Sequence, residues 1–77
     1  MRIRINGEAR DFVGPVSVSA LLTALDIDPR RVAVEHNLVI VRREAYDATI
    51  VADGDEIEIV NFVGGGALAS RTHRRDR

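Results

Sequence analysis

The feature that most constrains this chain is a single short helical pattern with strand-like segments on both sides. Four apolar residues recur at the spacing of one helix face, and we assign them to the core: Val18, Leu21, Leu22 and Leu25. Ser17, just before them, can cap the helix by accepting a bond from a free backbone N–H. The helix must end by Asp28-Pro29, because proline lacks an N–H and restricts the residue before it.

The segment before the helix predicts a β-hairpin. Arg2–Ile5 alternates charged and apolar residues, which is typical of a strand with one buried face. Asn6-Gly7 favours a type I′ turn, because both central residues of that turn need a positive φ. Glu8–Val13 then returns as a second strand with Ala9 directed inward, and Gly14-Pro15 ends the hairpin.

Further strand-like segments follow the helix. Residues 32–34 are apolar without alternation, which predicts a short central strand that is buried on both faces. Residues 38–41 form a second apolar run, and Thr49–Val51 reads as a brief strand. Asp53-Gly54 is a turn signal before a well-marked last strand at residues 55–62.

This order of elements predicts an α+β fold of the β-grasp, or ubiquitin-like, type. A mixed sheet of four to five strands would pack on one helix. If the strand after the helix runs parallel to the first strand, the right-handed crossover rule places the helix on one face of the sheet. Residues 1–63 would form this domain, and a chain of 77 residues fits one small domain.

The composition excludes several classes of site. The chain has no cysteine, hence no disulfide framework, thiolate metal site or cysteine nucleophile, and the cytoplasm is the default location. His36 and His73 are far apart and lack a ligand cluster, so we expect no metal site. The acidic turn at residues 53–56 lacks the further ligands of a calcium loop. No apolar run approaches the roughly 20 residues that span a bilayer, so we expect no membrane partner.

The charge of the chain is unevenly distributed. Residues 1–66 hold seven arginines and eleven acids, a formal charge of −4, whereas residues 67–77 hold four arginines and one aspartate, or +3. The basic ending has no interleaved aromatic residues and no nucleic-acid motif, so we expect no nucleic-acid partner. We interpret residues 67–77 as a disordered C-terminal extension.

Three consecutive glycines, residues 64–66, follow the last predicted strand. Glycine has no Cβ, so a glycine arm can enter a slot too narrow for any side chain. Fully extended, residues 61–66 would reach about 20 Å from the sheet, at roughly 3.3–3.6 Å per residue. A flexible linker to the basic extension explains the same glycines equally well.

Several segments together resemble a known family: Val34–Asn37, Ile40-Val41, Arg43, Tyr46, Asp53–Asp55, Ile57–Val60 and Phe62–Gly66. With them, residues 1–66 resemble the ThiS family of sulfur carriers in thiamin biosynthesis. The resemblance implies a protein cosubstrate rather than an enzyme, with no cofactor of its own. It also implies two partners. A ThiF-type enzyme uses ATP to adenylate the terminal carboxylate, which becomes a thiocarboxylate, and a ThiG-type thiazole synthase takes its sulfur.

The same resemblance implies roles for five residues. Gly66 would be the thiocarboxylate acceptor, and Gly64 and Gly65 the thin neck before it. Phe62 and Val63 either finish the core or lie in an apolar docking patch for the partners, and we favour docking. A monomer is the expected state of a free carrier.

The sequence departs from the family after Gly66, where Ala67–Arg77 follows. Gly66 then ends in an amide, which cannot be adenylated as a carboxylate can. The resemblance therefore implies a processing protease that cleaves after Gly66. A diverged carrier, a MoaD-like carrier for molybdopterin synthesis and a non-catalytic β-grasp module with a glycine linker remain alternatives.

Overall fold

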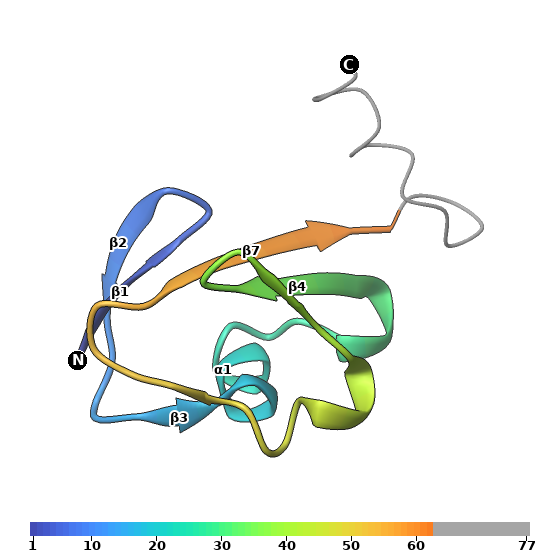
Figure 1. The fold of residues 1–77 in the computed structure, drawn as a ribbon, viewed down its shortest axis with the longest axis horizontal. Coiled ribbons are helices and arrows are strands. Elements are labelled where there is room, and N and C mark those ends of the chain that lie inside the picture. Colours follow the sequence, from blue (N-terminus) through green and yellow to red (C-terminus); the bar gives the residue numbers. More distant parts are fainter. Residues whose placement is uncertain (63–77) are drawn as a thin grey trace.

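The computed structural model describes residues 1–62, which form one helix, two 3₁₀ turns and seven short strands (Figure 1). The strands are β1 (Arg2–Ile5), β2 (Glu8–Asp11), β3 (Val16–Ser17), β4 (Val32–His36), β5 (Val39–Val41), β6 (Ile50–Val51) and β7 (Glu56–Asn61). The helix is α1 (Val18–Ala24), and the 3₁₀ turns are η1 (Pro29–Arg31) and η2 (Arg43–Ala45). The predicted α+β fold of the β-grasp type is confirmed.

The last strand lies in the middle of the sheet. The five-stranded order is β2-β1-β7-β4-β5, and β3 and β6 form a separate pair. β7 runs parallel to β1, with Ile5 beside Ile57, and antiparallel to β4, with Val32 beside Asn61. The strand directly after the helix is therefore not the one that runs parallel to β1. η1 turns the chain so that β4 opposes β7, and only β7 returns parallel to β1.

The N-terminal hairpin has the predicted turn but a shorter second strand. Asn6 and Gly7 have φ values of 51° and 86°, as a type I′ turn requires. β2 ends at Asp11, and Val13 is fully exposed (100%). Ala9, expected to point inward, is exposed, because it pairs with Arg4 on the sheet face away from the helix.

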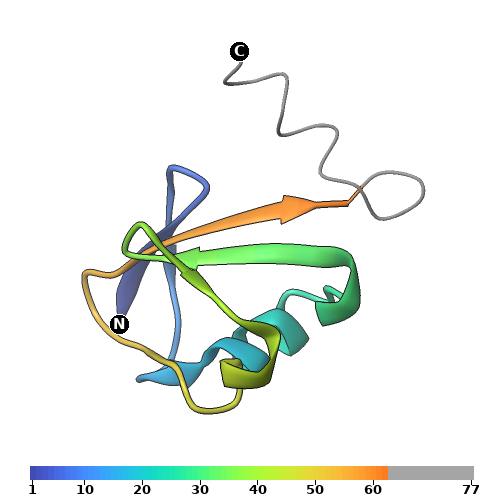
Figure 2. The same cartoon turned by 45° about the vertical axis from the view of Figure 1, so that its right-hand side comes forward.

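The helix packs under one face of the sheet, as Figures 1 and 2 show from two sides. Ser17 caps it as predicted, accepting a 3.0 Å bond from the Ala20 N–H. Leu25 is the C-cap residue rather than part of the helix, and it packs against the core half-buried. The core consists of Ile3, Ile5, Val18, Leu21, Leu22, Val32, Val34, Val41, Tyr46, Val51, Ile57 and Ile59. Burial of these twelve side chains fixes the position of β7.

Candidate functional site

The candidate site is the end of β7, where the predicted glycine arm begins. Phe62 is the last residue that the structure describes (Figure 1). Val63, the glycines at 64–66 and the extension at residues 67–77 lie outside the described residues. The structure therefore defines the base of the arm, and the roles assigned to Val63, Gly64, Gly65 and Gly66 stay predictions.

The chain is held by backbone hydrogen bonds up to the base of the arm. β7 pairs with β4 as far as Asn61, which lies beside Val32. One residue further, the Phe62 N–H donates a 2.8 Å bond to the Arg31 carbonyl. The direction in which the chain leaves the sheet is therefore set by η1 and the start of β4.

On its other side, β7 is held by a side chain rather than by a strand. β1 ends at Ile5, which lies beside Ile57, and the chain turns away at Asn6. The N–H and the carbonyl of Ile59 face this side of β7 but lie beyond the last paired residue of β1. The Asn6 carboxamide takes the place of the missing strand. Its Oδ1 accepts a 2.7 Å bond from the Ile59 N–H, and its Nδ2 donates a 3.1 Å bond to the Ile59 carbonyl. Asn6 thus extends the ladder towards the arm.

Phe62 itself is half-buried. Among the described residues it belongs neither to the buried core nor to the side chains packed against that core. A large aromatic side chain in this position keeps part of its ring available at the surface, which suits the docking role predicted for it.

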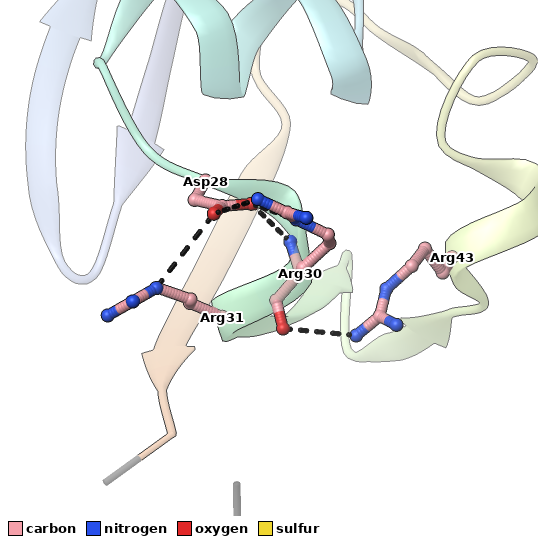
Figure 3. Close-up of polar contacts among 4 residues, drawn as sticks. All are labelled: Asp28, Arg30, Arg31 and Arg43. Carbon is pink, nitrogen blue, oxygen red and sulfur yellow. Dashed lines mark hydrogen bonds and ion pairs between the residues drawn. The ribbon is translucent and has the colours of Figure 1, made fainter. Parts of the chain in front are cut away.

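Three arginines lie on one side of the end of β7 (Figure 3). The carboxylate of Asp28 accepts bonds of 3.1 and 3.0 Å from the Arg30 guanidinium and lies 3.8 Å from Arg31. The Arg30 hydrogen bonds hold the pKa of the Asp28 carboxyl below its usual value, so this carboxylate stays charged. Arg43 reaches over from η2 and donates a 3.5 Å bond to the Arg30 carbonyl.

A second polar cluster lies at the opposite end of β7 and closes the turn before it. Asp55 Oδ2 lies 2.7 Å from His36 Nε2 and accepts a 2.9 Å bond from the Ala52 N–H. The His36 and Asp55 side chains are only 22% and 20% exposed. The hydrogen bond from His36, followed by that from Ala52, lowers the pKa of the Asp55 carboxyl. His36 and Asp55 therefore join β4 to the β6–β7 turn, far from the arm.

The hollow near the end of β7 has no nucleophile with a neighbouring base among its described lining residues. A hollow of 540 Å³ opens near the end of β7, and its described lining is mostly apolar and amide side chains with Glu8 and Arg10. That lining includes no serine, threonine, cysteine or histidine, so it offers no nucleophile with a neighbouring base. Within residues 1–62, no three acidic, histidine or cysteine side chains come together as a metal site would require. Nor does any helix in that range have the length and hydropathy to cross a bilayer.

The sequence model of the ThiS family matches residues 3–66, which is most of the chain. The chain belongs to the ThiS family. The match spans the whole described ThiS fold and continues through all three glycines, to Gly66.

Known proteins agree with this assignment. The crystal structure of the thiamine biosynthesis protein ThiS from Geobacter metallireducens superimposes with a TM-score of 0.77 at 39% identity, covering 86% of this chain and all of that one. The sulfur carrier protein ThiS of Bacillus subtilis is 40% identical over 65% of this chain and 76% of its own. A thiazole synthase of Paramagnetospirillum magneticum is 51% identical over 87% of this chain, but the match spans only 21% of that relative.

Sequence reasoning predicted a glycine arm for this ThiS-family chain but missed what holds the end of β7, where that arm would begin. Phe62 was singled out, whereas Asn6 was recognised only as a turn residue. The Asn-Gly signal explains the positive φ of Asn6, but nothing local indicates that its carboxamide binds Ile59, 53 positions further along. The arginines at residues 30 and 31 were likewise unremarkable in sequence.

Proposed function

We propose that this chain is a sulfur carrier of thiamin biosynthesis whose reactive group is the carboxylate of Gly66. The observation that supports it best is the family match, which runs through the fold and ends at Gly66. The geometry fits this role, because the arm would follow a central strand that is bonded to β4 up to its end and to Asn6 at Ile59 on its other side. The cysteine-free sequence suits a cytoplasmic reaction.

The reaction would use the carrier as a positioned substrate. A carboxylate oxygen of Gly66 would attack the α-phosphorus of ATP on a ThiF-type enzyme, releasing pyrophosphate and leaving an acyl-adenylate. A sulfide would then displace AMP and give the thiocarboxylate directly. A persulfide would displace AMP to give an acyl disulfide, and a thiol would attack its S–S bond, releasing the thiocarboxylate and forming a disulfide. The folded body contributes binding energy that holds the acyl group in place. Gly64 and Gly65 would pass through a narrow channel, since they have no side chains.

This proposal requires that residues 67–77 be removed. In the full chain the Gly66 carbonyl is part of an amide, which has no free carboxylate oxygen to attack ATP. A protease that cleaves between Gly66 and Ala67 would create the substrate.

The second proposed partner is a thiazole synthase of the ThiG type. The similarity to a relative that is itself named thiazole synthase supports this pairing. In that relative the segment similar to this chain is part of the same polypeptide as the rest of the synthase, so the carrier and the synthase would lie close together during the reaction.

ATP–pyrophosphate exchange by a ThiF-type enzyme tests the proposal. We expect residues 1–66 to support exchange, and the full chain and residues 1–64 to support none. With a sulfur donor present, the intact mass of residues 1–66 should shift by one oxygen replaced with sulfur. Absence of exchange with residues 1–66 would favour a glycine linker in an interaction module. Exchange with a molybdopterin-pathway enzyme in preference to the ThiF-type enzyme would favour the MoaD-like alternative.

A further inference from the structure

The arginines of the folded body are concentrated at the base of the arm. Residues 1–62 carry seven arginines and eleven acids, a formal charge of −4. Four of these arginines lie in η1, η2 and the residue before each of them, together with two acids, which makes this end +2. The rest of the body has three arginines and nine acids, or −6. The body is therefore polarised, with its positive end where the arm leaves.

Arg30, Arg31 and Arg43 form what we call the arginine collar. The Arg31 carbonyl binds the Phe62 N–H, so the collar shares backbone contacts with the base of the arm. Figure 3 shows Arg30 and Arg31 of η1 at Asp28, and Arg43 of η2 reaching the Arg30 carbonyl. The side chains of Arg30 and Arg31 are each 80% exposed, and Arg43 is also exposed.

The collar has more positive charge than its neighbours neutralise. The single carboxylate of Asp28 serves both Arg30 and Arg31, and its contact to Arg31 is long at 3.8 Å. Within residues 1–62, no acidic side chain forms an ion pair with Arg43, whose partner is the Arg30 carbonyl. Exposed guanidinium groups bind carboxylates well, since each presents a planar fork of N–H donors.

We propose that the arginine collar docks on acidic side chains that rim the pocket of the adenylating enzyme. This inference rests on the proposed function, and it adds the surface by which the enzyme recognises the carrier. An acidic rim would attract the collar and repel the rest of the body, which carries −6. Both effects turn the arm towards the pocket and raise the rate of productive encounter.

The length of the arm favours protein carboxylates over the phosphates of ATP. Four residues, 63–66, separate Phe62 from the reacting carboxylate, and they span at most about 14 Å when extended. When Gly66 lies at the α-phosphorus, the collar at the arm's base is held at the mouth of the pocket. The groups it meets there belong to the enzyme surface, whereas the phosphates lie beyond the Debye length of about 8 Å at physiological salt and are largely screened from it.

Charge reversal with a matched control tests the collar. In residues 1–66, Arg43→Glu changes the collar, and Arg4→Glu makes the same change of charge beside Glu56, at the start of β7 and away from the arm. We expect Arg43→Glu to lower the association rate constant with the ThiF-type enzyme about tenfold at low salt, and Arg4→Glu less than about twofold. The difference should vanish at about 1 M salt, where the Debye length is about 3 Å. Arg31→Glu serves as a second collar variant should Arg43→Glu fail to fold.

Three results would contradict the proposed docking of the collar on acidic side chains of the enzyme. Equal effects of Arg43→Glu and Arg4→Glu would mean that only net charge matters. An effect that persists at high salt would mean that the substitution changed packing instead. A raised KM for ATP with an unchanged KM for the carrier would place the collar on phosphate. Exchange by unsubstituted residues 1–66 separates the two proposals. If these residues support no exchange, the proposed function and the collar are both overturned. If they support exchange but Arg43→Glu has no effect, the collar alone is overturned.

Discussion

Removing the Asn6 carboxamide should loosen the last strand where it carries the arm. Asn6→Gly keeps the positive φ of the turn without steric cost and deletes both bonds to Ile59, one of 2.7 Å and one of 3.1 Å. Each such bond contributes about 0.5–1.5 kcal/mol net. Ile59 is only 9% exposed, so its backbone groups would be poorly reached by water. We expect a loss of about 2 kcal/mol in the free energy of unfolding.

Two companion variants separate the causes of this loss. Asn6→Ala deletes the same bonds and adds the strain of a Cβ at a φ of 51°, so it should cost roughly 1 kcal/mol more than Asn6→Gly. Asn6→Asp keeps the acceptor for the Ile59 N–H and loses the donor, so it should cost about 1 kcal/mol. In a domain this small, 2 kcal/mol corresponds to a fall in Tm of roughly 8–16 °C.

Urea denaturation measures the stability, and amide hydrogen exchange locates the effect. In Asn6→Gly, the Ile59 amide should lose protection, whereas the amides of Glu58 and Val60, which face β4, should keep most of theirs. Unchanged protection at Ile59, or a loss of stability below about 0.5 kcal/mol, would show that the carboxamide does not hold β7.

Three further predictions follow from contacts already described. Ser17→Ala should cost about 1 kcal/mol of stability in chemical denaturation, because the cap to the Ala20 N–H is lost. Phe62→Ala should cost no more than about 1 kcal/mol, since the ring is half-buried, yet weaken binding to a ThiF-type enzyme in a titration. Asp55→Ala should cost about 1–3 kcal/mol at neutral pH. That deficit should shrink below about pH 4, because the lowered pKa of Asp55 means that its ionised form stabilises the fold and is lost on acidification.

Each of these has a control and a contrary outcome. Thr23→Ala, on the exposed side of α1, should cost nothing, and an equal loss there would remove the capping argument. Ile57→Ala in the core should cost about 2–5 kcal/mol, and a similar loss for Phe62→Ala would make Phe62 a core residue. Parallel stability curves for the wild type and Asp55→Ala down to about pH 2 would show that the Asp55 carboxylate does not stabilise the fold.

The sequence reveals local structure more readily than pairing. The Asn6-Gly7 turn and the capped helix follow from backbone preferences and side-chain periodicity within a few residues. The turn at Asn37-Leu38 gave no such signal, because Leu38 adopts a φ of 71°, which a branched apolar residue rarely does. The local sequence gives even less information about which residues of two strands lie beside each other. Arg4 pairs with Glu56 across most of the chain, and alternation predicts a strand without naming its neighbour.

The same distinction applies to the candidate site. The glycines could be recognised from composition, since only glycine lacks a side chain. The groups that position Phe62 are the Arg31 carbonyl and, through Ile59, the Asn6 carboxamide. Every residue has a backbone carbonyl, so the sequence does not show which one binds Phe62. Asn6 is explained by its turn, so the sequence gives no reason to expect its contact with Ile59.

The central place of β7 makes closure of the sheet depend on residues far along the chain. β1 and β4 have no direct pairing in the five-stranded sheet, so until residues 56–61 have been synthesised they lack the strand that joins them. Such long-range closure is slow. Because the three glycines at residues 64–66 follow β7, any product long enough to contain them also contains the strand that completes the sheet.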